Sequence, residues 1–163
     1  MPTLVTRIVL AGTEGAVSPA RRAVVEQVRV WGVPLDEQTA DAIGMVASEL
    51  ITNAVLHGGG RITIGLYHQP GRLIIDVLDE SPAAPLLKVA EDEDESGRGM
   101  ALVASLATRS GWEPAERGKH VWAEITLPKP APAIRAAVLR RFFSAQQNAL
   151  ARPTPHPFAL AVA

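Results

Sequence analysis

The chain has 163 residues, a net charge of −1 and no cysteine, so one domain can bury a core, and disulfides or thiolate metal sites are impossible. The N-terminus has no basic segment followed by an apolar run, and no apolar stretch approaches the ~18 residues of a membrane span, so we expect a cytoplasmic protein without a membrane partner. Residues 128–163 carry five basic residues and no acid, while the preceding residues sum to −6. An acidic body argues against direct nucleic-acid binding.

The first half of the chain predicts one strand and two helices. Residues 3–10 are rich in β-branched side chains and form the expected strand. Ser18 is the expected N-cap of a helix that has Pro19 at its first position and runs to Gly32. A longer helix is expected from about residue 36 to residue 57, before three consecutive glycines.

The second half predicts two hairpins around a third helix. Their expected strands cover residues 61–68, 72–79, 111–116 and 119–127, and the helix covers 99–109. Residues 80–96 hold a run of five acids and are expected to form a mobile loop. The pattern predicts an α+β fold, a two-layer α/β sandwich with a mixed sheet and helices on one face, over residues 1–127. Residues 128–163 are either a solvated extension, part helical over 131–150, or an interaction arm.

A polar column lies on the otherwise apolar second helix. Glu49, Asn53 and His57 follow one another at four-residue spacing and therefore share a helix face. The Asn53 carboxamide suits Mg²⁺, a hard cation that takes few protein oxygens, and Glu49 is placed to polarise a group that attacks a γ-phosphate. Taken alone, the column is better explained as a solvated surface.

Two later features fit the same ligand. Asp79 ends an apolar strand and could accept a hydrogen bond from an adenine amino group, or simply start a turn. Gly97-Arg98-Gly99 precedes a helix whose free amides and dipole favour phosphate, with Arg98 adding charge, although a flexible hinge is the alternative. The chain has no P-loop, dinucleotide-binding glycine motif, zinc-ligand spacing or hydrolase elbow.

In this order the motifs resemble those of the GHKL (Bergerat-fold) ATPases, and specifically the actinobacterial anti-sigma-factor serine kinases related to histidine-kinase ATPase domains. Glu49-Leu50-x-x-Asn53-Ala54-x-x-His57-Gly58 is similar to the N box, and Asp79 to the aspartate of the first glycine box. Gly97-Arg98-Gly99-Met100-x-Leu102-Val103 is similar to the second glycine box. Gly118-Lys119-His120-Val121-Trp122 enters the final strand, and the resemblance covers roughly residues 5–127.

The resemblance implies ATP and Mg²⁺ as cofactors and a role for each motif residue. Asn53 would coordinate the metal, Glu49 would assist phosphoryl transfer, Asp79 would bind adenine and residues 81–98 would form a lid over ATP. The other residues expected at the nucleotide are His57, Gly97, Arg98, Gly99, Met100 and Lys119. The implied partners are a sigma factor and an anti-sigma-factor antagonist, which would be phosphorylated on serine, and the apolar first strand and helix allow a homodimer.

The chain departs from the family pattern at two places. Residues 80–83 lack the glycines that usually follow the aspartate, and His120 stands where serine or threonine is common. These departures favour a second hypothesis, a non-catalytic module that binds a protein partner with ATP structural or absent. A third is a plain α+β domain with an accidental set of motifs.

Overall fold

The computed structural model describes residues 3–83 and 98–129, except for the side chain of Leu4. All of these residues lie in the first of two units, Met1–Pro130, and the second unit is Ala131–Ala163. Most of the loop expected over residues 80–96 and the helix expected over 131–150 therefore lie outside the described residues. Within the described ranges, no helix combines the length and hydropathy needed to cross a bilayer.

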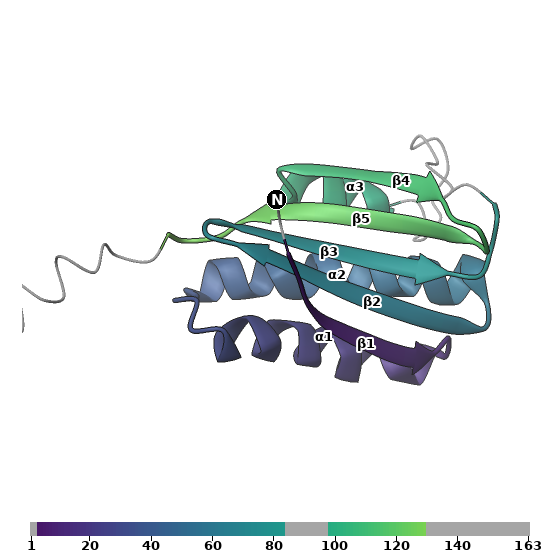
Figure 1. Cartoon of the computed structure of the whole chain (residues 1–163), viewed down its shortest axis with the longest axis horizontal. Helices are drawn as coiled ribbons and strands as arrows, with labels where there is room; N and C mark the ends of the chain where they lie inside the picture. Colours follow the sequence, from purple (N-terminus) through teal and green to yellow (C-terminus); the bar gives the residue numbers. More distant parts are fainter. Residues whose placement is uncertain (1–2, 84–97, 130–163) are drawn as a thin grey trace, which may run out of the picture. The chain divides into compact units, whose positions relative to one another are not determined.

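The described part contains five strands and three helices. In chain order they are β1 (Thr3–Ala11), α1 (Glu14–Val30), α2 (Glu37–Gly58), β2 (Arg61–Gln69), β3 (Arg72–Asp79), α3 (Arg98–Leu106), β4 (Arg109–Pro114) and β5 (Lys119–Thr126). The strands form one sheet in the order β1-β2-β3-β5-β4, and the helices cover one of its faces (Figure 1). The predicted two-layer α+β fold is confirmed.

The predicted mixed sheet is wrong, because all four strand pairs are antiparallel. Two helices connect β1 to β2, and the chain reverses direction at each of the three turns along this path. β2 therefore runs antiparallel to β1. A single helix, α3, connects β3 to β4, which consequently run in the same direction, as a helical crossover requires. β5 then folds back between these two strands, and no parallel pair is formed.

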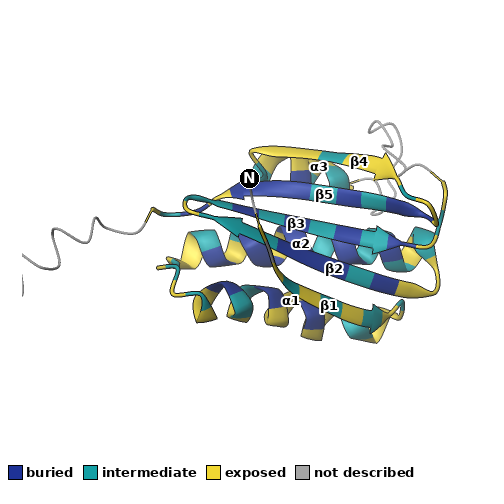
Figure 2. Ribbon diagram, in the orientation of Figure 1, coloured by how far each residue is buried: buried dark blue, intermediate teal, exposed yellow. Residues whose placement is uncertain are grey.

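The core lies between the sheet and the helices, as the dark central strands of Figure 2 show. Side chains alternate between the two faces of a strand, and in β3 the buried positions are every second residue. Leu73, Ile75 and Val77 fill the core in this row, and Asp79 is the fourth member, so the strand carries a carboxylate into the buried layer. The helix side of the core comes mainly from α2, where eight residues are buried.

Two predicted helix ends are wrong by three or more residues, and the strand expected over 111–116 is shifted by two residues to Arg109–Pro114. α1 begins at Glu14 after Thr13, and Ser18 and Pro19 lie inside it. The buried Ala20, Val24 and Val28 hold this helix against the core, and this packing outweighs the single backbone hydrogen bond that proline removes. α3 ends at Leu106, three residues before the expected end, because the backbone N–H of Thr108 already donates to the carbonyl of Glu124 in β5.

The start of α2 at Glu37 agrees with the sequence and makes a testable prediction. Asp36 is the N-cap, and its Oδ1 accepts from the Thr39 backbone N–H at 2.7 Å. Two hydrogen bonds from Thr39 hold the pKa of Asp36 below its ordinary value. The side chain of Thr39 has the larger effect and its backbone N–H the smaller one. A carboxyl group whose pKa is lower in the folded state stabilises the fold at any pH above its unfolded-state pKa. This stabilisation is lost as the pH falls through the pKa of the folded state.

We therefore expect Asp36→Ala to lower the midpoint of thermal unfolding at neutral pH. The difference from the unaltered protein should shrink as the pH drops below about 4. Asp36→Asn is the matched control, because it keeps an acceptor oxygen and removes the titrating group. An Asp36→Ala difference that is the same at pH 7 and below the carboxyl pKa would contradict the role assigned to this charge.

Candidate functional site

The C-terminal half of α2 forms one wall of the candidate site. Leu50, Ile51 and Ala54 are buried against the core, while Glu49 and Asn53 on the neighbouring face are half-buried. Glu49 lies against the first turn of α3, because a Cβ added to Gly99 would overlap Glu49 Oε2. The structure thus brings together the carboxylate of the first predicted motif and a glycine of the second.

The opposite end of the site contains a buried ion pair. Asp79 ends β3 and Lys119 begins β5, and the two residues are direct cross-strand partners. Lys119 Nζ donates to Asp79 Oδ1 at 3.0 Å and lies 2.9 Å from Oδ2, with the side chains 1% and 0% exposed. The Ser81 backbone N–H also donates to Oδ1 at 2.8 Å. Oδ2 is engaged by the same ammonium group and has no further partner among the described residues, so a lone pair of this oxygen remains available.

Two glycines allow this carboxylate to lie so deep. A Cβ on Gly58, the last residue of α2, would lie 2.6 Å from Asp79 Cβ and 2.8 Å from its Cγ. A Cβ on Gly118 would overlap the Asp79 carbonyl oxygen, and Gly118 has φ of +95°, a conformation that favours glycine. The end of α2 and the turn before β5 therefore close around Asp79 from two sides.

Asn53 lies between these two ends and has an unusual environment. Its Oδ1 is buried and accepts no hydrogen bond. A buried acceptor without a donor is destabilising, and such atoms in native proteins often mark the place of a ligand or ion. Glu49 and Gly58 are nine residues apart on α2, about 13 Å along the helix axis. Asn53 is therefore the central polar group of an elongated site.

The other predicted residues occupy different positions. His57 is half-buried on the last turn of α2, and Arg98 is exposed at the first position of α3. Met100 packs against the hydrophobic core and therefore contributes to its packing. Gly97 lies outside the described residues.

The sequence interpretation missed how Lys119 is used. Lys119 is expected at the nucleotide from the motif resemblance, and its ammonium group contacts Asp79, another residue expected there. Ser81 lies in the segment 80–83, which lacks the glycines of the family pattern, and its backbone N–H orients the same carboxylate. The cross-strand register of β3 and β5 is the signal that would have paired Asp79 with Lys119, and it is available only after the strand order is known.

The arrangement joins three chemical capacities. An ionised carboxylate with a free acceptor oxygen can bind an amino group, an unpartnered amide oxygen can coordinate a hard cation, and a carboxylate beside a helix N-terminus lies where anions are favoured. Asn53 follows Glu49 by one turn of α2, and Asp79 lies against Gly58 at the end of the same helix. A nucleotide with its metal ion has complementary groups.

Comparison with known proteins agrees with this description. The family model of the histidine kinase-like ATPase domain matches residues 10–125. A search of curated proteins gave no significant match. A crystal structure of the RsbU and RsbW domains of Rv1364c from Mycobacterium tuberculosis is similar in fold, with a TM-score of 0.56 and 20% identity over 77% of this chain. This chain spans 32% of that protein's length.

A second solved structure is the histidine kinase domain of the blue-light activated histidine kinase EL346 from Erythrobacter litoralis. It is 24% identical over 55% of this chain and 45% of its own, with a TM-score of 0.44.

Proposed function

This chain belongs to the histidine kinase-like ATPase domain family, and we propose that it is a regulatory kinase that binds ATP with Mg²⁺. Its substrate is a serine hydroxyl on a partner protein, an anti-sigma-factor antagonist, and its second partner is a sigma factor. Support for these partners comes from the motif resemblance and from the fold shared with the RsbU and RsbW domains of Rv1364c. The proposal includes a homodimer as the working assembly.

The observation that carries the proposal is the buried, unpartnered Oδ1 of Asn53. A neutral oxygen suits Mg²⁺, which keeps several waters and takes most of its remaining ligands from phosphate. Mg²⁺ bound at Asn53 would neutralise charge on the phosphates. Among the described residues no cluster of three or more histidine, aspartate or glutamate side chains forms an all-protein metal site, which is consistent with a metal that arrives with the nucleotide.

The remaining groups have roles that follow from their surroundings. Asp79 Oδ2 accepts from the adenine amino group, because it is the carboxylate oxygen that receives no backbone N–H. Glu49 accepts the proton of the serine hydroxyl while the serine oxygen forms a bond to the γ-phosphorus. The bond between the γ-phosphorus and the oxygen that bridges it to the β-phosphate breaks, and ADP leaves with the electron pair of that bond. The N-terminus of α3 beside Glu49 favours the phosphate charge.

One observation favours the non-catalytic alternative. Residues 80–83, directly after Asp79, contain no glycine, and the Ala83 backbone N–H donates to Ser81 Oγ at 3.3 Å, a local bond that stiffens the segment after β3. A stiff segment suits a module that holds a protein partner, with ATP bound as a structural ligand or absent. Turnover distinguishes the two functions, because only the kinase consumes ATP.

Calorimetric titration with ATP, with and without Mg²⁺, tests the nucleotide site. The unaltered protein should bind more tightly with the metal, and Asn53→Ala should bind ATP equally in both conditions because the only assigned protein ligand of the ion is gone. Asp41→Ala is the matched control, since Asp41 is exposed near the start of α2. Retained Mg²⁺ dependence in Asn53→Ala would refute the metal role of Asn53. No binding at millimolar ATP in the unaltered protein would refute the nucleotide site itself.

A further inference from the structure

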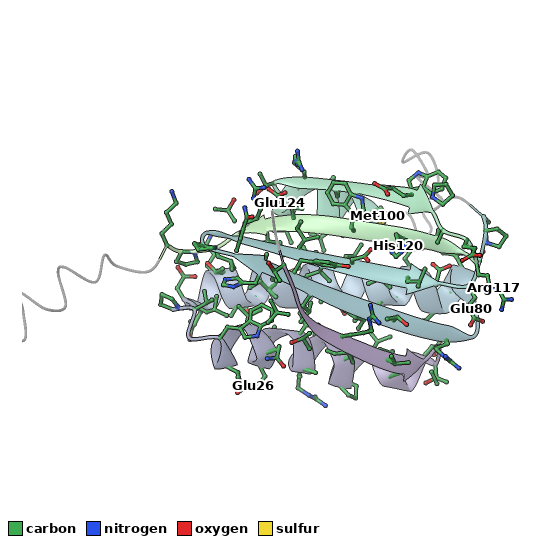
Figure 3. The ribbon with its side chains drawn as sticks, in the orientation of Figure 1. Glu26, Glu80, Met100, Arg117, His120 and Glu124 are labelled. Carbon is green, nitrogen blue, oxygen red and sulfur yellow. The ribbon has the colours of Figure 1, made fainter. Side chains whose placement is uncertain are left out.

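The face of the sheet away from the helices has its own cluster of side chains. Strand alternation puts Asp79 and Lys119 on the helix side, so their neighbours Asp76, His120 and Trp122 lie on the uncovered side. Figure 3 labels His120 and Glu124 along β5 on the side of the sheet opposite the helices. The cluster is therefore separated from the candidate nucleotide site by the thickness of the sheet.

A hollow of about 410 Å³ lies at the centre of this face, lined by β2, β3, β4 and β5. Its apolar lining includes Tyr67, the only tyrosine of the chain, Ile74 and Trp122. The Trp122 ring lies over Gly111, where an added Cβ would be 3.0 Å from Cζ2. Aromatic side chains grouped in an exposed hollow are typical of protein interfaces and of sites for cations.

The hollow also holds a carboxylate that is costly to bury. The Asp76 side chain is 15% exposed, and its Oδ2 lies 2.9 Å from His120 Nδ1. Burial raises the pKa of Asp76, His120 opposes this shift, and Glu113 adds to it through charge repulsion. Glu113 lies directly across from His120 in the β4–β5 pair and lines the same hollow. The carboxylates of Asp76 and Glu113 are thus both neighbours of the His120 imidazole.

Arg109 lines the hollow and Arg72 lies close to it, but both arginines pair with a different carboxylate, that of Glu124. Arg72 Nε lies 3.2 Å from Glu124 Oε1, and an Arg109 amino group lies 3.4 Å from Glu124 Oε2. Arg7 shares a cross-strand row with Asp76, but Gly65 intervenes, which separates Arg7 from Asp76 by two strand spacings, about 9.5 Å. Within residues 3–83 and 98–129, neither Asp76 nor Glu113 forms an ion pair with lysine or arginine.

We propose that this hollow is a docking site for an arginine side chain presented by a segment of a partner protein. A guanidinium group between Tyr67 and Trp122 stacks on aromatic faces and brings its N–H donors to Asp76 and Glu113. An arginine fits better than a lysine, because its planar group stacks and donates in two directions at once. This interaction does not depend on the nucleotide site, and its test is separate.

The test is a titration followed by ¹⁵N NMR of the whole chain at neutral pH, with the Trp122 indole N–H as reporter. The probes are the capped peptide Ala-Ala-Arg-Ala-Ala, the same peptide with leucine in place of arginine, and N-acetyl-arginine methylamide. The arginine peptide should shift the Trp122 signal saturably, with a dissociation constant of about a millimolar, and bind more tightly than the single residue. Asp76→Asn should weaken the peptide by about tenfold, while Asp41→Asn should leave it unchanged.

Each other outcome overturns a defined part of the proposal. Equal binding of the leucine peptide would make the hollow a general apolar site. If a folded Asp76→Asn protein bound the arginine peptide as tightly as the unaltered protein, the Asp76 carboxylate would have no part in recognising it. Binding of the single residue as tight as that of the peptide would assign the site to a free guanidinium compound, and absence of saturable shifts would refute it altogether.

Discussion

Replacing Glu49 with glutamine is expected to slow ATP hydrolysis by about 10²–10⁴-fold, the range observed when a general base is removed. The substitution keeps the size and the polar contacts of the side chain and removes only its basicity. ATP affinity should stay close to that of the unaltered protein, because Asn53 and Asp79 carry binding in the proposed site. Release of inorganic phosphate from ATP is the measurement, with water standing in for the serine hydroxyl.

A matched substitution makes the Glu49 result interpretable. Glu26→Gln makes the same chemical change on the exposed face of α1 and should leave the rate unaltered. A Glu49→Gln protein that hydrolyses ATP at the normal rate would show that this carboxylate is not the base. An unaltered protein that binds ATP and never releases phosphate would instead support the non-catalytic module.

The family and most elements could be predicted from local sequence signals. Asp36 marks the start of α2 through an N-cap that the structure contains, and the Gly58–Gly60 run marks its end. The start of α1 could not be predicted in this way, because Thr13 makes no side-chain capping hydrogen bond. Helix α1 instead depends mainly on contacts with α2, which a local signal does not contain.

In the candidate site, too, some contacts follow from local sequence and others depend on the whole topology. Glu49 and Asn53 share one helix, so their proximity follows from helical geometry alone. The pairing of Asp79 with Lys119 requires β3 and β5 to be neighbours, although α3 and β4 lie between them in sequence. The mixed sheet was predicted wrongly for the same reason, since the insertion of β5 between β3 and β4 is a property of the whole topology.

Replacing Lys119 with methionine should cause the largest loss of stability. Methionine matches the length of the apolar stem, but it leaves the Asp79 carboxylate buried without a counter-charge. Removing one partner of a buried ion pair typically costs about 3–5 kcal/mol, which corresponds to a fall of roughly 10–20 °C in Tm for a domain of this size. Thermal unfolding followed by circular dichroism measures this loss.

The double variant Lys119→Met/Asp79→Asn separates stability from recognition. It removes both charges and keeps an amide oxygen that can accept from the Ser81 backbone N–H, so most of the lost Tm should return. ATP should bind more weakly than to the unaltered protein, because the asparagine NH₂ group replaces the carboxylate oxygen that accepts from the adenine amino group. If Lys119→Met alone melted at the same temperature as the unaltered protein, Asp79 would have to be hydrated in solution. Recovery of both Tm and ATP affinity in the double variant would instead show that the ion pair is structural and that the base is bound elsewhere.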